Sequence, residues 1–305
     1  MNRKSDSRNN LVEGSIRQSL IRMTLPMIVG MFMLFTFSLV DTWFISFLGT
    51  DSLTAISFTF PVTFTVTSLA IGLGIGAAAV VGKCLGSSAF EAAKQAATVI
   101  NYLSFGLTAV LAICLWWFME PIFALMGADP ALFSAISAYM NVWFPGSVLV
   151  VCIMSGNSVL RACGDTKTPS ILMAAAGLLN AVLDPFLIFG LGPFPELGIA
   201  GAAWATVIAW SVGFVYLMHL LVIQRELVSA SLPSLEAFRQ SGRDMLRIGI
   251  PAAGANMMTP LASGVMTAIA AGFGGNAVAA YGVGARLEPM ATLLVLAMSS
   301  SLPPL

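Results

Sequence analysis

The chain has 305 residues, of which 58% are hydrophobic and only 9% are charged, and its formal net charge is zero. Soluble globular proteins carry roughly 25% charged residues, so this chain has too few charges to cover a water-exposed surface. No nucleophile–base pair and no nucleotide-binding loop is evident, so we do not expect an enzyme. The composition instead predicts a membrane protein.

The hydrophobic residues are grouped in long blocks. A bilayer core about 30 Å thick is crossed by about 20 apolar residues in a helix, and in lipid the backbone must satisfy its own hydrogen bonds. In chain order the blocks predict eight spans: 22–47, 53–81, 95–119, 132–159, 168–191, 198–223, 246–272 and 277–301. We therefore expect an all-α membrane protein, a polytopic helical bundle. The first block is too long for a cleavable signal peptide and lacks a small-residue cleavage site.

The charges between the spans predict the orientation of the chain. Lys and Arg in short loops favour the cytoplasmic side. These bases precede span one or follow spans two, four and six: Arg3, Lys4, Arg8, Arg17, Arg22, Lys83, Lys94, Arg161, Lys167, Arg225, Arg239, Arg243 and Arg247. The other loops carry only acids: Asp51, Glu120, Asp129 and Glu196. We therefore expect a multi-pass protein of the plasma (inner) membrane with a cytoplasmic N-terminus.

Four charged residues remain inside the predicted spans. A charge at the centre of a membrane helix costs at least about 2.5–3.5 kcal/mol, so such residues face a cavity or find partners. Asp41 in span one and Asp184 in span five are the first functional candidates, although each could be a buried carboxyl group that bonds to a neighbouring helix. Arg286 and Glu288 in span eight have opposite signs. Pairing with each other or with another helix is as consistent with the sequence as a role in transport.

A polar group surrounds Asp184. Asn180 precedes it by four residues and shares its helix face, and Pro185 lacks an N–H and disturbs the local hydrogen bonds, which can free a carbonyl. These oxygen donors suit a small hard cation, or a proton held by the acid. Asn157 in span four and Thr206 in span six could add oxygens. Each of these two is weak support alone, because single Asn and Thr residues often join helices.

An offset of 225 residues aligns the chain with itself. Leu25-Pro26 then falls on Ile250-Pro251, and the turn at 47–55 falls on 272–280. The offset covers six spans, an even number, so the copies share one orientation, and repeats of this kind place a substrate site between two lobes. We predict a cytoplasmic segment at 1–21, a six-helix lobe at 22–224, a cytoplasmic linker at 225–245, and the first two helices of a second lobe at 246–305. A full second lobe needs six spans, so we expect the sequence to be truncated.

Three segments resemble the MATE family, the multidrug and toxic compound extrusion transporters. They are the span-one pattern from Pro26 to Val40-Asp41-Thr42, the stretch from Asn157 to Pro169, and the segment from Asn180 to Asp184-Pro185. The resemblance extends from about Ile16 to Leu305. It implies a fold of twelve helices in two lobes of six, of which spans nine to twelve are missing here. It also implies export of cationic or amphipathic compounds in exchange for Na⁺ or H⁺.

The resemblance also implies which residues act. The first-lobe cation site would use Asp41, Asn180, Asp184 and Thr206, as a Na⁺ site or a proton site, with Asn157 nearby. Independently of the resemblance, prolines inside spans, Pro26 and Pro185 among them, are typical of helices that bend during gating, although packing irregularity explains any single proline better. Some family members carry an essential acid in span seven, but this sequence has none there.

We therefore predict a secondary active multidrug efflux antiporter that works by alternating access. Its partners would be a small cationic or amphipathic substrate and the lipid bilayer, with no nucleic acid and no cofactor other than the coupling ion. Two alternatives are a flippase of similar fold for lipid-linked or polysaccharide precursors, and a fragment that does not transport. The sequence does not distinguish Na⁺ from H⁺, name the substrate or give the oligomeric state.

Overall fold

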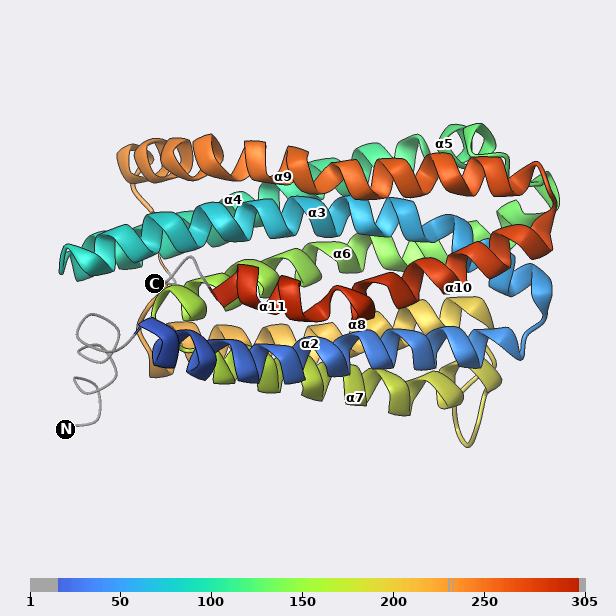
Figure 1. Ribbon diagram of the computed structural model, residues 1–305, viewed down its shortest axis with the longest axis horizontal. Helices are drawn as coiled ribbons and strands as arrows, with labels where there is room; N and C mark the ends of the chain where they lie inside the picture. Colours follow the sequence, from blue (N-terminus) through green and yellow to red (C-terminus); the bar gives the residue numbers. More distant parts are fainter. Residues whose placement is uncertain (1–15, 230, 232, 302–305) are drawn as a thin grey trace.

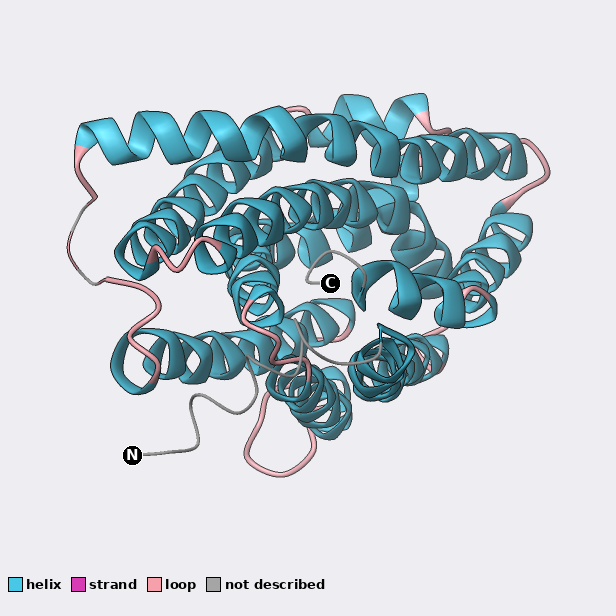
Figure 2. Ribbon diagram, turned by 60° about the vertical axis from the view of Figure 1, so that its left-hand side comes forward, coloured by secondary structure: helices cyan, strands magenta, loops and turns pink. Residues whose placement is uncertain are grey.

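The computed structural model describes residues 16–229, 231 and 233–301. Most of the predicted N-terminal segment, with Arg3, Lys4 and Arg8, lies outside these residues. Within the described part all regular structure is helical, and no strand occurs (Figure 2). The prediction of an all-helical membrane bundle is therefore confirmed.

The helices run along the long axis of the molecule and are joined by short turns at its two ends (Figure 1). In chain order the elements are α2 (Ile16–Ser46), α3 (Thr50–Gly86), α4 (Phe90–Trp117), α5 (Met119–Leu125), the short 3₁₀ helix η1 (Pro130–Leu132), α6 (Phe133–Ala162), α7 (Lys167–Phe189), α8 (Ile199–His219), the short π-helix η2 (Leu220–Gln224), α9 (Leu235–Ala271), α10 (Gly275–Ala291) and α11 (Leu293–Ser301).

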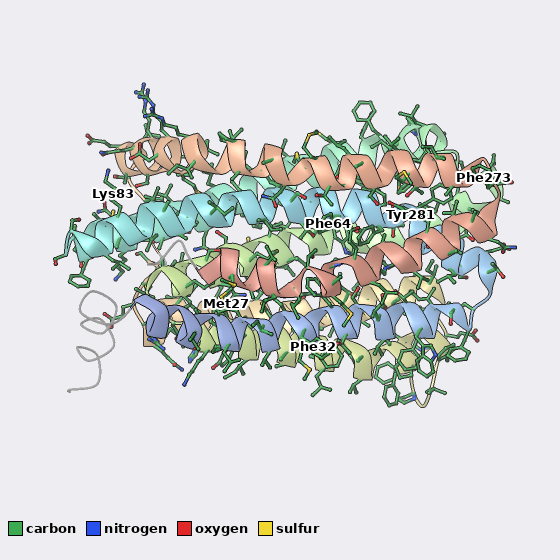
Figure 3. The ribbon with its side chains drawn as sticks, in the orientation of Figure 1. Met27, Phe32, Phe64, Lys83, Phe273 and Tyr281 are labelled. Atoms are coloured by element: carbon green, nitrogen blue, oxygen red, sulfur yellow. The ribbon has the colours of Figure 1, made fainter. Side chains whose placement is uncertain are left out.

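Six stretches of the described chain are long and apolar enough to cross a membrane. They are Thr24–Ser46, Thr50–Gly86, Phe90–Trp117, Pro130–Ala162, Lys167–Phe189 and Ile199–Gln224. They correspond to predicted spans one to six. The turns with bases and the turns with acids lie at opposite ends of the bundle: in Figure 3, Lys83 is at the end where α9 begins, and Phe273 is at the other end. We call these the basic end and the acidic end.

The last two predicted spans differ from the structure in extent. The predicted linker at 225–245 is partly helical, because α9 begins at Leu235 after Ser234, whose hydroxyl accepts a hydrogen bond from the Ala237 N–H at 3.3 Å. This polar first part is held by packing of its Gly242 and Met245, which are buried. The predicted span 277–301 is divided into α10 and α11 at Thr292, three residues after Pro289. Helix α9 is long enough to cross a membrane but less apolar than the six spans, and α10 and α11, with 17 and 9 residues, are shorter than they are, so the crossing of the membrane by these two regions stays a prediction.

The internal repeat has a structural counterpart in two helical hairpins. Helix α2 ends at Ser46 and α9 at Ala271, and α3 begins at Thr50 and α10 at Gly275, in both cases with the offset of 225. Gly49 (φ 106°, ψ 170°) and Gly274 (φ 100°, ψ 168°) precede the second helix of each hairpin in the same conformation. A positive φ of this size favours glycine. The two turns are therefore repeated in backbone geometry as well as in sequence.

Helix α3 lies at the centre of the bundle and packs against α9 through small residues. A Cβ atom at Gly72 would lie 2.4 Å from the Cβ of Ala253, and one at Gly76 would lie 2.6 Å from the Met245 carbonyl oxygen. Small side chains allow two helix backbones to approach closely. The contact joins the first six helices to the second hairpin.

Candidate cation-binding site

The strongest predicted pair, Asn180 and Asp184, lies on α7 and faces α8. The Asn180 side-chain amide donates to Asp184 Oδ1 at 3.3 Å and to the Thr206 hydroxyl at 3.2 Å. Asp184 is fully buried and Asn180 is buried, whereas Thr206 is half-buried. The spacing of four residues therefore does place the two polar groups together, and α8 adds the hydroxyl oxygen.

Asp41 reaches the same region from α2, which packs beside α7 (Figure 1). Its carboxyl group is close enough to that of Asp184 for the two to interact electrostatically. One of its oxygens, Oδ1, is buried without a hydrogen-bond partner. The structure therefore brings the two acids of the predicted spans into one cluster with Asn180 and Thr206.

Two carboxylate oxygens of the cluster, Asp41 Oδ1 and Asp184 Oδ2, are buried and have no hydrogen-bond donor in the described structure, and the same holds for Thr36 Oγ1 on α2 and, outside the cluster, for Asn157 Oδ1 on α6. Buried polar atoms are nearly always paired, so orphaned acceptors indicate a missing donor or cation. Carboxylate, amide and hydroxyl oxygens are the ligands of hard cations. The residues therefore fit a small hard cation or a proton. Among the described residues there is no group of three or more His, Cys, Asp or Glu side chains placed to hold a metal ion.

Asn157, on α6, is buried, but no hydrogen bond joins it to Asn180, Asp184 or Thr206 in the described structure. Asn157 is five residues before the end of α6 at Ala162, near the basic end of the bundle, whereas Asp184 is five residues before the end of α7 at Phe189, near the acidic end. The structure therefore does not place Asn157 at the cluster, contrary to the prediction that it lies nearby.

Arg286 is the one basic side chain that faces the cluster in the described residues. It is only 8% exposed, its Nη2 donates to the Ile56 carbonyl at 3.2 Å, and its guanidinium carbon lies 5.6 Å from the centre of the Phe60 ring. It interacts electrostatically with Asp41, although no ion pair within 4 Å joins them. Glu288 is exposed, and no ion pair joins it to Arg286. Of the alternatives left open by the sequence, the structure thus favours contact between Arg286 and the first lobe.

Sequence reasoning missed Tyr139. This α6 residue is buried and lies within electrostatic range of Asp41, Asp184 and Arg286. A tyrosine in an apolar block has no distinguishing signal in one sequence, because its ring is an ordinary core residue. Its hydroxyl nevertheless adds a polar atom from a fourth helix to the region of the cluster.

The cluster lies closer to the acidic end of the bundle than to the basic end. Asp41 is five residues before the end of α2 at Ser46, and Asp184 is five residues before the end of α7 at Phe189. With a rise of 1.5 Å per residue, each acid is about 8 Å from that end along its helix. Thr206, seven residues into α8, lies at about 10 Å by the same measure.

Both prolines predicted to take part in gating lie inside helices. Pro185 follows Asp184 directly in α7, and Pro26 lies in α2. A proline at position 185 cannot donate to the Ala181 carbonyl, so that oxygen is freed one turn before the acid. The structure therefore places a helix irregularity next to Asp184.

The chain shares this helical architecture with known proteins. The MatE family model matches residues 26–186, a stretch that includes Asp41, Asn157, Asn180 and Asp184. The chain belongs to the MATE family of transporters. It is therefore a transporter-family membrane protein and not an enzyme.

Two curated MATE relatives differ in the substrates that their names give. The chain is 41% identical over 297 residues to an FAD transporter of Shewanella oneidensis, covering 97% of this chain and 66% of the relative. It is 25% identical over 289 residues to the multidrug export protein MepA of Staphylococcus aureus, covering 94% of this chain and 63% of the relative. The chain thus spans slightly less than two thirds of the length of these relatives.

Solved MATE structures share the fold. The Vibrio cholerae MATE transporter VcmN in its bent form matches with a TM-score of 0.82 and 35% identity, over 98% of this chain and 66% of that chain. A MOP superfamily transporter from Pyrococcus furiosus matches with a TM-score of 0.82 and 28% identity, over 96% of this chain and 64% of that chain. The helical bundle is therefore the one found in this family.

Proposed function

We propose that the chain belongs to a cation-coupled exporter of small molecules, in which Asp41 and Asp184 bind the coupling cation. The observation that carries this proposal is a pair of acids, Asp184 buried and Asp41 half-buried, each with one buried oxygen that lacks a donor. The Asn180 amide donates to Asp184 and also to the Thr206 hydroxyl, so Thr206 helps to hold the amide against Asp184. The expected ion is Na⁺ or H⁺, and the chemistry of these oxygens accepts either.

The charges of the cluster support binding of one positive charge at a time. With both acids ionised, Asp41 and Asp184 carry two negative charges, and Arg286 supplies one positive charge. One cation or proton would balance the remainder. Binding would draw α2 and α7 together around the cation, and Pro26 and Pro185 would allow these helices to bend. Alternating access would follow from movement of the two lobes.

For the substrate we propose a cationic or amphipathic compound, in line with the multidrug export relative. A second candidate is an anionic dinucleotide such as FAD. The 41% identity to an FAD transporter favours it. The buried guanidinium of Arg286 beside Phe60 also favours it, because arginine binds phosphate and stacks on aromatic rings.

The proposal is tested in proteoliposomes with an imposed Na⁺ or proton gradient. Movement of a fluorescent cationic dye and of FAD is measured for the chain and for Asp41→Asn and Asp184→Asn. Both variants should lose gradient-driven movement. The matched control Asp51→Asn, which changes an exposed acid in the first turn of α3, should keep it.

Each outcome has a defined meaning. Gradient-driven transport at the original rate by the Asp41→Asn or the Asp184→Asn variant would reject the cation site. If folded wild-type chain moves neither compound, this chain alone is not a sufficient transporter. The same assay on a twelve-helix relative carrying the same substitutions would then test the site.

We also propose that the basic end faces the cytoplasm of a cell bounded by the plasma membrane, because Lys and Arg favour that side. A cysteine-free chain with Lys167→Cys should resist a membrane-impermeant thiol reagent in intact cells, whereas one with Glu196→Cys should react. The reverse pattern would overturn this orientation.

A further inference from the structure

A surface groove lies between α4 and the first half of α9, near the basic end. Its volume is about 900 Å³, and it lies outside the cation cluster. The lining residues are Leu103, Leu235, Phe238, Arg239, Gly242, Arg243, Leu246, Arg247, Ile250 and Pro251. At Gly242 the two helices are in ordinary packing contact, because a Cβ there would lie 3.9 Å from side-chain atoms of Val99 and Leu103.

The groove is basic on one side. Arg239, Arg243 and Arg247 follow one another at intervals of four residues, so they form one row along α9. All three are exposed, and none makes an ion pair in the described structure. Among the residues that the structure describes, no acid lines the groove, although Glu236 and Asp244 lie on the same helix. The groove therefore carries three uncompensated positive charges.

The rest of the lining is apolar: Leu235 and Phe238 lie before the arginine row, toward the basic end, and Ile250 and Pro251 lie after it, away from that end. Ile250 and Pro251 follow Arg247 along α9, and Ile250 is 58% exposed. From Arg239 to Pro251 the helix rises about 18 Å. A ligand that fits this lining has a negative group at one end and a long apolar part at the other.

The groove begins near the basic end of the bundle and extends inward from it. Met245 contacts α3 at Gly76, and Lys83 lies seven residues further along α3, about 10 Å away. Because α9 runs antiparallel to α3, Arg239 lies near the level of Lys83, and Arg247 lies deeper. In Figure 3, Lys83 is close to the beginning of α9. The arginine row thus extends inward from the level of the loops.

We propose that this groove binds one anionic phospholipid, with its phosphate on the row of Arg239, Arg243 and Arg247 and an acyl chain along Leu246, Ile250 and Pro251. Basic pockets on the cytoplasmic side of membrane helices suit anionic headgroups, and each nearby base contributes to their attraction. The lipid would attach to both α4 and α9, so it would stabilise the contact between the first six helices and the second hairpin. This site is separate from the proposed coupling-cation site.

The test uses the full chain purified in an uncharged detergent. Its thermal unfolding is followed during titration with phosphatidylglycerol, phosphatidylcholine of the same acyl chains, or glycerol 3-phosphate, and bound lipid is counted by native mass spectrometry. Phosphatidylglycerol should raise the unfolding temperature and remain bound, whereas the other two should do neither. This comparison separates the charge of the headgroup from the apolar chains.

Variants then locate the site. Arg243→Gln should weaken phosphatidylglycerol binding about fivefold, the value of one nearby base at a membrane surface, and the triple change to Gln at 239, 243 and 247 about 100-fold. Lys167→Gln, which removes one exposed charge at the same end outside the groove, should leave binding unchanged. All three positions are exposed, so the variants should fold, and unfolding without lipid checks this.

Three results would overturn the proposal. They are equal stabilisation by phosphatidylcholine, equal stabilisation by glycerol 3-phosphate, which would mark a free-phosphate site, and equal weakening by Lys167→Gln and Arg243→Gln. Loss of dye or FAD transport in the Asp41 and Asp184 variants is independent of these results, so the two proposals can fail separately.

Discussion

The contact between Gly282 and Ser57 provides a sharp test of how the two hairpins meet. These residues are equivalent in the internal repeat, since 57 plus 225 is 282, and they face each other on α3 and α10. A Cβ added at Gly282 would lie 2.1 Å from Ser57 Oγ, 2.3 Å from Ser57 Cβ and 3.1 Å from Ser57 Cα. Optimal separations are about 3.5–4.0 Å, so the helices would have to move apart.

We expect Gly282→Ala to lower the free energy of unfolding by about 1–3 kcal/mol, the usual cost of forcing extra atoms into a packed contact. The control is Gly284→Ala, two residues away on the same helix, where an added Cβ meets nothing within 4 Å. It should be neutral or slightly stabilising, because alanine favours helix over glycine. Thermal and denaturant unfolding in detergent measure both.

A second substitution tests the cause. Ser57→Gly removes the two atoms closest to the new Cβ, so adding it to Gly282→Ala should recover most of the loss, with a remainder from the 3.1 Å approach to Ser57 Cα. Equal effects of the two alanine variants, or no recovery in the double variant, would refute the close contact of α3 and α10.

Three further predictions concern the cluster and the basic end. Thr206→Val removes an acceptor of the Asn180 amide, and such a hydrogen bond is worth about 0.5–1.5 kcal/mol. The cation concentration that gives half of the maximal transport rate should therefore rise about two- to tenfold. Thr206→Ser, which keeps the hydroxyl, should leave that concentration unchanged. Arg286→Gln removes the positive neighbour of Asp41 and should lower the cation concentration needed for half-maximal transport, whereas Arg286→Lys should leave it near the original value. An increase in that concentration with Arg286→Gln would contradict the charge balance. Arg225→Ala breaks the 2.9 Å ion pair with Asp165, which is partly exposed, so the unfolding free energy should fall by about 0.2–1 kcal/mol at low salt and less at high salt.

The features that the sequence predicted well are those that depend on local spacing. The four-residue interval of Asn180 and Asp184 places both on one helix face whatever surrounds the helix. The turns at Gly49 and Gly274 follow from a repeated pattern, and their matching φ values explain why glycine occurs at both positions. Hydrophobic length likewise predicted the first six spans.

The features that could not be predicted depend on how distant helices pack. Arg286 and Ile56 are 230 residues apart, and no pattern in one sequence indicates that they meet. Tyr139 joins the region of the cluster only because α6 packs near it. The early beginning of α9 was missed because its first part is polar, and packing of Met245 against α3, which makes it helical, is a tertiary effect.

The position of the acids along their helices has an electrical consequence. At about 8 Å from the acidic end, the cluster lies about a quarter of the way across a 30 Å bilayer core. A membrane voltage of 100 mV is worth about 2.3 kcal/mol per elementary charge across the full thickness. Moving one cation from the acidic end to the cluster would therefore involve about 0.6 kcal/mol of electrical energy at 100 mV. Its release from the cluster to the basic end would involve about 1.7 kcal/mol. Loading would depend weakly on voltage, and about three quarters of the electrical work would be done in the release step.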